Sequence, residues 1–331
     1  MPIVSLDEIE MVTRKALIAH GAAPFPAAEV ARAVRAAESY GNKICGLYYV
    51  ESYCLQLASG RVKGAVEPVV THPKPAVVHV DAGFGFAQPA FAHGLVPALE
   101  AARAFGTATL AVGHAHTCTS LGYFTEQIAA SGCIALGFTN ASPIVAAPGG
   151  KTRVIGTNPI AFSVPDGKGG LAMHMDQSTT TVALGKITMA HARGDKIPLG
   201  WALDAEGQPT TDPAKALQGS LVSMGEYKGW GFGLMAELFA AAMTGSVLSR
   251  DVKPLKAPEG PPHNLGQFYI LVDPDVSNAF PARLAALAGN VAVDPDARMP
   301  GQTRTPATSV EVAPEVWSRI EELAQGSTPS A

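Results

Sequence analysis

Apolar segments of two kinds alternate through the middle of the chain, and this alternation limits the folds that the sequence can adopt. Residues 76–82 (AVVHVDA) and 107–113 (TATLAVG) are short and rich in β-branched residues, which predicts strands. Between them, residues 89–105 (PAFAHGLVPALEAARAF) are long enough for a helix. A helix near 121–131 and a strand at 133–140 (CIALGFTN) repeat the pattern. Such alternation predicts an α/β core built on a central sheet.

Both ends of the chain are predicted to be mainly helical. Ser5 and Glu8 fit a capping box at the start of a first helix, and a second helix ends near Gly41. Residues 48–60, 281–289 and 313–325 are also expected to be helical. In the middle of the chain, further helices are expected at 182–194 and 229–245, and a further strand at 268–274. The tail GSTPSA (326–331) is expected to fray.

This distribution predicts two structural parts. Residues 1–72 would form a helical N-terminal subdomain, packed with the C-terminal helices within 276–331. Residues 73–275 would form the α/β core that binds cofactor and substrate. The chain has 331 residues, 47% hydrophobic and 16% charged, so it can fill a core of this size and does not have the composition of a disordered protein.

Composition also excludes several classes of function. The net charge is −4 and no basic stripe is visible, so no nucleic-acid partner is expected. No apolar run reaches the ~18 residues of a membrane span. The start, MPIVSLDEIE, is too acidic and polar for a signal peptide, which favours a cytoplasmic protein. The four cysteines form no CxxC pair, and reduced thiols are expected.

The common phosphate-binding and nucleophile motifs are missing. GFGFAQ (83–88) has two of the three glycines of a Rossmann fingerprint, and GKGG (167–170) lies in a polar turn with no helix behind it. Neither a Walker A loop nor a GxSxG elbow is present. These glycines are therefore interpreted mainly as turn residues.

Two further patterns are weak. His114 and His116 form an HxH pair after a strand, but no acidic or thiol partner stands at a recognisable spacing, and Cys118 is the closest thiol. No metal is therefore predicted. Cys45 follows Lys43, whose ammonium could lower the pKa of a thiol. A buried, inert cysteine is the more common alternative.

Four segments rich in Gly, Thr, Ser and Asn adjoin apolar runs. They are GHAHTCTSLGYF (113–124), APGGKTRVIGTNPIAF (147–162), MDQSTTTVALGK (175–186) and GEYKGWGFGLM (225–235). Loops of this composition offer backbone amides and hydroxyls to a bound anion or amide. They predict a ligand-binding α/β protein.

GTNPIAF (156–162) is the most specific piece of a wider resemblance. It is supported by GYF (122–124), FTN (138–140), the segment from Asp176 to GK, GWALD…GQPTTDP (200–213), YKGWGFGLMAE (227–237) and NLGQFYILVDP (264–274). Together they resemble the malate/L-lactate dehydrogenase family. VDAGFGFAQPA (80–90) looks most like its Δ1-piperideine-2-carboxylate/Δ1-pyrroline-2-carboxylate reductase branch. The resemblance implies a non-Rossmann NAD(P)-binding fold with a central mixed sheet, flanking helices and a helical subdomain from both termini. It also implies NADPH or NADH as cofactor and a homodimer.

The resemblance carries site residues over to this chain. Cofactor-binding residues would be Thr117, Cys118, Thr119, Ser120, Leu121, Asp176, Gln177, Ser178, Tyr227 and Lys228. Thr157 would touch the substrate. Arg298 and Arg304 would reach the cofactor's phosphates, and two arginines suit a 2′-phosphate.

The chain departs from the family at the catalytic positions. The family usually carries Ser-His-Gly after the second helix, with the histidine as proton donor, where this chain has Ile44, Cys45 and Gly46. A family arginine that holds the substrate carboxylate is replaced by Tyr49. A second family histidine falls at Thr117, one position after His116.

The departures allow either lost activity or altered chemistry, and the intact cofactor segments favour the second. A carbonyl needs a proton donor as hydride arrives, because an alkoxide develops. A cyclic imine can arrive already protonated, and hydride addition then gives a neutral amine. An imine reductase therefore loses less than a lactate or malate dehydrogenase when the histidine is absent.

Replacement roles remain open. Cys45 is a candidate weak donor with an ordinary pKa of about 8.5, and His116 a candidate if its loop is displaced, although a backbone-bonded loop histidine is an equal alternative. Lys43 or His114 could pair with the carboxylate, or Lys43 could be a solvated surface charge. Tyr49 could form a pocket wall or pack in the core.

The predicted activity is NAD(P)H-dependent reduction of a cyclic 2-imino acid, Δ1-pyrroline-2-carboxylate or Δ1-piperideine-2-carboxylate, to L-proline or L-pipecolate. The alternatives are a 2-hydroxyacid dehydrogenase with a relocated acid and a catalytically silent nucleotide-binding homologue. The expected partner is a small 2-imino or 2-oxo acid.

Overall fold

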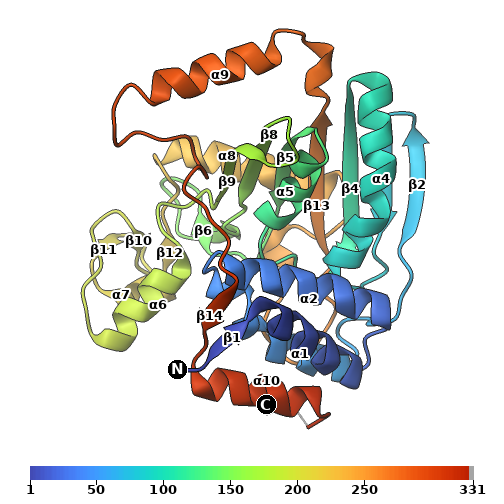
Figure 1. The fold of residues 1–331 in the computed structure, drawn as a ribbon. Coiled ribbons are helices and arrows are strands. Elements are labelled where there is room, and N and C mark those ends of the chain that lie inside the picture. The colour runs from blue at the N-terminus through green and yellow to red at the C-terminus, as the bar shows by residue number, and fades with distance from the viewer. Residues whose placement is uncertain (328–331) are drawn as a thin grey trace.

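A seven-stranded mixed sheet forms the centre of the computed structural model, which describes residues 1–327 (Figure 1). β3 and β4 are parallel, and the other neighbours are antiparallel. In spatial order the strands are β2 (Val69–Lys74), β3 (Val77–Asp81), β4 (Thr107–Ala115), β13 (Leu265–Val272), β5 (Ile134–Thr139), β8 (Ile160–Pro165) and β9 (Leu171–Gln177). The predicted α/β class and mixed sheet are confirmed.

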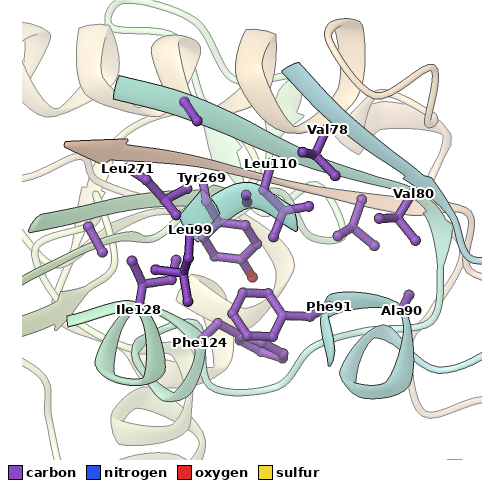
Figure 2. Packing of buried hydrophobic residues seen from close by; sticks show 14 of the residues in the cluster. Val78, Val80, Ala90, Phe91, Leu99, Leu110, Phe124, Ile128, Tyr269 and Leu271 are labelled. Atoms are coloured by element: carbon purple, nitrogen blue, oxygen red, sulfur yellow. The ribbon is translucent and has the colours of Figure 1, made fainter. Parts of the chain in front are cut away.

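One face of this sheet is covered by α4 (Ala87–Phe105) and α5 (Gly122–Ala130). Figure 2 shows the Tyr269 ring of β13 facing Phe91 of α4 and Phe124 of α5, with ring centroids 5.2 and 6.0 Å from Tyr269. The opposite face packs against α8 (Tyr227–Glu237) and the π-helical turn η3 (Leu238–Ala242), where Phe239 stacks on Phe138. The sheet is therefore buried on both faces, which explains its nearly continuous apolar strands.

The N-terminal helices form a second apolar cluster with the end of the chain. It joins α1 (Leu6–Ala19), α2 (Pro24–Ser39), α3 (Val50–Ala58) and α10 (Pro314–Ala324). The capping contact predicted at α1 is present, because the amide of Glu8 donates to Ser5 Oγ at 3.2 Å. β1 (Ile3–Ser5) pairs antiparallel with β14 (Ser309–Glu311), which ties the two ends together.

A smaller five-stranded sheet lies beside the main one and was not anticipated from the sequence. Its strands are β11 (Pro209–Thr210), β10 (Ala202–Leu203), β12 (Ser220–Leu221), β6 (Val145–Ala146) and β7 (Arg153–Ile155). It packs with α6 (Leu184–Arg193) and α7 (Pro213–Gln218) around a cluster that includes Val145, Ile187 and Ala202. The core predicted at 73–275 thus contains two sheets.

Two details depart from the expected organisation. The boundary predicted at residue 72 falls inside strand β2. α9 (Phe280–Val291) has no buried residue and stands away from the other helices, so α10 alone of these two packs on the N-terminal helices (Figure 1). Four residues of the predicted frayed tail, 328–331, lie outside the described residues.

Candidate active site

Cys45 is positioned by two short 3-10 turns that follow α2. They are η1 (Lys43–Cys45) and η2 (Leu47–Tyr49), joined by Gly46. A Cβ at Gly46 would lie 2.1 Å from Glu38 Oε1, so the backbone needs glycine to approach this carboxyl. Glu38 in turn accepts a hydrogen bond of 2.7 Å from the Leu47 amide. The buried Glu38 side chain therefore fixes the turn that presents Cys45.

Burial and two nearby charges of opposite sign determine the pKa of the Cys45 thiol. Burial raises the pKa of its thiol to about 11, and the Asp176 carboxylate adds to that rise. A hydrogen bond with Asn42 and the nearby Lys256 ammonium act in the opposite direction. A thiol with this pKa stays protonated at neutral pH and is a poor acid.

Lys256 stands over the aromatic residues that follow Cys45. Its Nζ lies 3.5 Å from the centroid of the Tyr48 ring and 5.2 Å from that of Tyr49. Tyr49 is buried, and its hydroxyl faces the Leu255 carbonyl at 3.5 Å. A cation from a distant loop therefore covers the position at which the family resemblance expects an arginine.

His116 is fully buried beneath this region. Its Nε2 lies 2.6 Å from Gln56 Oε1, and its ring stacks on that of His263 with 3.9 Å between centroids. Tyr53 and Phe86 cover its edges. Burial lowers the pKa of His116 well below its usual value, and His263 adds to this effect. The side chain is thus a neutral hydrogen-bond donor to Gln56, and its role as a relocated acid stays a prediction.

The loop at Thr117–Leu121 is held by Asp176 at the end of β9. The Asp176 carboxylate accepts hydrogen bonds from the Gly122 amide at 2.7 Å and from Ser120 Oγ at 3.3 Å. Although Asp176 is exposed as a residue, protein atoms surround its carboxyl group, and this burial raises the pKa of the carboxyl. The hydrogen bond from the Gly122 amide acts in the opposite direction and lowers the pKa. Two of the segments carried over by resemblance are therefore in direct contact.

Thr157 joins the same edge of the sheet. Its carbonyl accepts both the amide of Thr179 at 2.9 Å and the Thr179 hydroxyl at 3.0 Å. Gln177 ends β9 opposite Ile160, and Ser178 follows it, with its hydroxyl 2.9 Å from that of Thr180. This places Thr157 beside the segment from Asp176 to Ser178, and its contact with the substrate stays a prediction.

The remaining predicted residues have other partners. Tyr227 and Lys228 line a hollow of about 520 Å³ at the start of α8, together with Gly231, Phe232 and Met235. Lys43 donates to the Glu311 carbonyl at 3.3 Å, and His114 Nδ1 lies 3.0 Å from Asp81 Oδ1. His114 and His116 thus contact different partners. The role of Lys43 toward the substrate stays a prediction.

The two predicted arginines lie on the segment that leads to β14. Arg304 pairs with Glu126, and its guanidinium lies 3.6 Å from the centroid of the Tyr40 ring. Arg304 and Ser120 line one small cavity of about 20 Å³. Arg298 is exposed at the start of this segment. The chain therefore brings one predicted phosphate ligand next to the Thr117–Leu121 loop.

The donor set fits a nicotinamide dinucleotide. Ser120, Thr119 and Ser178 supply hydroxyls, Tyr227 an exposed aromatic ring, and Lys228 and Arg304 cations. Hydroxyls and cations suit ribose and phosphate groups, and an aromatic ring suits a flat base. These residues come from separate segments of the chain and not from one glycine-rich fingerprint.

Four residues of this region were not predicted as site residues from the sequence: Lys256, Gln56, Arg61 and His263. Gln56 carries a signal that could have been used, because it stands among the apolar residues Tyr53 and Leu57 of a predicted helix and is fully buried. Lys256 carries none, since it is an exposed lysine in a proline-rich loop about 200 residues from Tyr49 in sequence, a separation that only the fold closes.

The fold is a mixed α/β sheet without a Rossmann fingerprint, which is the kind of fold that the resemblance to this class of oxidoreductases implies. A family model for malate/L-lactate dehydrogenase matches residues 4–320. The chain belongs to the malate/L-lactate dehydrogenase family. This confirms the predicted family, its fold, and an oxidoreductase that uses a nicotinamide cofactor. Within residues 1–327, no helix has both the length and the apolar character that crossing a membrane requires.

Several named proteins are similar over most of the chain. A (2R)-3-sulfolactate dehydrogenase (NADP(+)) of Chromohalobacter salexigens is 37% identical over 91% of this chain and 90% of that protein. A Δ1-pyrroline-2-carboxylate reductase of Ancylobacter novellus is 34% identical over 91% and 89%. The crystal structure of Δ1-piperideine-2-carboxylate reductase from Pseudomonas syringae pv. tomato has a TM-score of 0.87 at 31% identity and covers 98% of this chain and 100% of that one.

Proposed function

We propose that this protein reduces a cyclic 2-imino acid, Δ1-pyrroline-2-carboxylate or Δ1-piperideine-2-carboxylate, to L-proline or L-pipecolate. One observation carries the proposal: Cys45 and Tyr49, which stand where relatives usually carry a catalytic histidine and a carboxylate-binding arginine, are both poor proton donors at neutral pH. Burial raises the pKa of Cys45 to about 11 and that of Tyr49 further still. His116 is neutral and bonded to Gln56.

A site of this kind favours an iminium over a ketone. Reduction of a ketone leaves an alkoxide that needs a proton, whereas an iminium accepts a hydride at C2 and moves its C=N electron pair to nitrogen as a neutral amine. The reduced nicotinamide would supply that hydride. When ionised, the Asp176 carboxylate near Cys45 stabilises the iminium cation before the hydride arrives.

The residues proposed to hold the cofactor are those carried over by resemblance. They are Thr117 to Leu121, Asp176 to Ser178, Tyr227 with Lys228, and Arg298 with Arg304. NADPH is the proposed cofactor, with NADH as the alternative. The two arginines and the NADP(+) in the name of the sulfolactate dehydrogenase support this choice. Thr157 is proposed to contact the substrate.

The named relatives support two chemistries. Several are Δ1-pyrroline-2-carboxylate reductases, which agrees with the proposal. The sulfolactate dehydrogenase, at 37% identity, acts on a 2-hydroxy acid and favours the alternative of a 2-hydroxyacid dehydrogenase. In that case Cys45 or another group would have to deliver the proton. Tight cofactor binding without turnover would instead indicate the silent homologue.

We also propose a cytoplasmic homodimer. α9 has no buried residue, and Leu287 on it is 52% exposed. Phe232 on α8, Leu238 in η3 and Met243 directly after η3 are also exposed. We propose that these apolar side chains take part in the subunit contact. Sedimentation equilibrium measures the mass, and a mass near 34 kDa at micromolar concentration would contradict the dimer.

The activity is tested by following NADPH and NADH oxidation at 340 nm. Δ1-Pyrroline-2-carboxylate, Δ1-piperideine-2-carboxylate, pyruvate and oxaloacetate are compared at equal concentration. We expect kcat/KM for one imine to exceed that for both 2-oxo acids by at least about 100-fold, the scale of rate that a general acid contributes. Faster turnover of a 2-oxo acid would overturn the proposal in favour of the dehydrogenase.

A further inference from the structure

We infer that the Lys256 ammonium binds the carboxylate of the substrate and replaces the arginine that relatives usually carry at the position of Tyr49. The inference rests on the proposed function, because it assumes a 2-carboxylate substrate. It adds a binding residue that lies outside every segment by which the family resemblance was recognised.

The position of the ammonium carries the inference. Lys256 Nζ lies 3.5 Å above the centroid of Tyr48 and 5.2 Å from that of Tyr49. Both rings follow the turn that presents Cys45. The ammonium is also close enough to Cys45 to act on its thiol. Lys256 therefore places a cation next to position 49 from a loop that is distant in sequence.

The loop that carries Lys256 is anchored on both sides of the residue. Gln56 Nε2 donates to the carbonyls of Leu255 and Ala257, each at 2.8 Å. These are the two peptide carbonyls that flank Lys256. Gln56 is itself oriented by His116, since its Oε1 accepts from Nε2 of that histidine at 2.6 Å. The side chain starts from a backbone whose position is fixed by one buried amide.

Further donors hold the rest of the loop. Arg61 Nε donates to the Pro261 carbonyl at 3.0 Å and its Nη1 to that of Ala257. Ser59 Oγ donates to the Pro258 carbonyl at 2.7 Å. Gln56 and Arg61 are at most 2% exposed. Buried polar groups are costly unless they are paired, and here the pairing fixes a loop whose own side chains are largely exposed.

The charge pattern matches the proposed substrate. A protonated cyclic 2-imino acid has a carboxylate and an iminium on adjacent atoms. The Lys256 ammonium, which lies over the rings of Tyr48 and Tyr49, supplies the cation that this carboxylate requires.

The test compares Lys256→Gln with Lys253→Gln, a neighbouring exposed lysine of the same loop. Pyrrole-2-carboxylate, a flat and non-reducible acid, and its carboxamide are titrated into NADP⁺-saturated protein by calorimetry. KM and kcat for Δ1-pyrroline-2-carboxylate are measured on the same proteins. We expect Lys256→Gln to weaken carboxylate binding and raise KM by 10- to 100-fold, while carboxamide binding and kcat change less than about threefold. Lys256→Arg should restore most of the affinity.

The proposed role of Lys256 would be wrong if Lys256→Gln bound the carboxylate as tightly as the parent protein does. It would also be wrong if the substitution weakened the binding of the carboxylate and of the carboxamide equally. Failure of the parent protein to bind the carboxylate at all would also overturn it. If the parent protein binds the carboxylate through Lys256 but reduces neither imines nor 2-oxo acids, the proposed function is wrong, while the role of Lys256 in binding the carboxylate is supported.

Discussion

His116 and Gln56 meet at 2.6 Å between the imidazole Nε2 and the amide Oε1, in a region that solvent does not reach. This contact fixes which end of the Gln56 amide points at the 255–257 loop, because Oε1 is engaged and only Nε2 is left to donate. We therefore propose that His116, a candidate acid in the sequence, acts as a positioning residue. It orients the group that holds Lys256.

Gln56→Leu tests that relationship. The change removes two donors to backbone carbonyls and leaves His116 Nε2 unpaired, so we expect the free energy of unfolding to fall by about 2–4 kcal/mol. We also expect KM to rise more than kcat falls. Urea denaturation and steady-state kinetics measure both effects. Gln325→Leu, at an exposed position after α10, is the control and should change stability by less than about 0.5 kcal/mol. If KM were unchanged, the anchoring of the 255–257 loop by Gln56 would not contribute to substrate binding.

Cys45→His should restore an acid next to Asp176. An imidazole titrates near neutral pH, so we expect reduction of pyruvate or oxaloacetate to rise by about 10- to 100-fold. Cys45→Ser offers neither an acid nor a thiol and should leave imine reduction within about threefold of the parent. Initial rates at 340 nm with each substrate provide the comparison. A loss of imine reduction in Cys45→Ser as large as about 100-fold would identify the thiol as the donor.

Stability should fall as the pH drops below about 6.5. Burial lowers the pKa of His174 to about 4 and that of His263 to about 3, and lowers that of His116 well below its usual value. Below pH 6.5 the unfolded chain binds protons that the folded protein does not, so unfolding gains about 1.4 kcal/mol per pH unit for each such histidine. The effect is absent above about pH 7.

His263→Asn isolates one of these contributions. The asparagine Oδ1 can accept the Thr117 amide in place of His263 Nδ1. We expect the slope of unfolding free energy against pH, measured by urea denaturation between pH 4.5 and 5.5, to decrease by about 1.3 kcal/mol per unit. A slope equal to that of the parent protein would mean that His263 is not held neutral in the fold.

Gly122→Ala should displace Asp176. The added Cβ would lie 2.8 Å from His174 Cε1 and 2.9 Å from Asp176 Cβ, closer than packed atoms allow. We expect a loss of about 2 kcal/mol in stability and a weaker affinity for NADPH, measured by urea denaturation and fluorescence titration. Gly289→Ala, in α9 with no atom near the new Cβ, should instead be neutral or stabilise by up to about 1 kcal/mol. Equal behaviour of the two variants would contradict the packing argument.

The sequence predicted those parts of the fold whose segments are long and periodic. The helix at 89–105 and the strands at 76–82, 107–113 and 133–140 correspond to α4, β3, β4 and β5 within a few residues. The five-stranded sheet escaped prediction because four of its strands have only two residues, too few to display an alternation. β13 enters between β4 and β5 from about 130 residues away, and no local pattern encodes that neighbour.

The site divides in the same way. The Thr117–Leu121 loop and Asp176 were expected from motifs, and their contact through Ser120 and Gly122 brings them together. Lys256 could not be predicted, because its relation to Tyr49 depends on the anchoring of a loop by side chains of α3 and of the turn after it.

The most direct test of the central claim uses a substrate that cannot exchange a proton at nitrogen. 1-Methyl-Δ1-pyrrolinium-2-carboxylate is a permanent iminium, and its reduction by NADPH is followed at 340 nm from pH 6 to 9, alongside Δ1-pyrroline-2-carboxylate and pyruvate. If the protein supplies no proton, kcat/KM for the methylated iminium is constant over this range and exceeds that for pyruvate. Pyruvate turnover faster than that of either iminium, or a fall in all three rates through one shared pKa, would contradict the account.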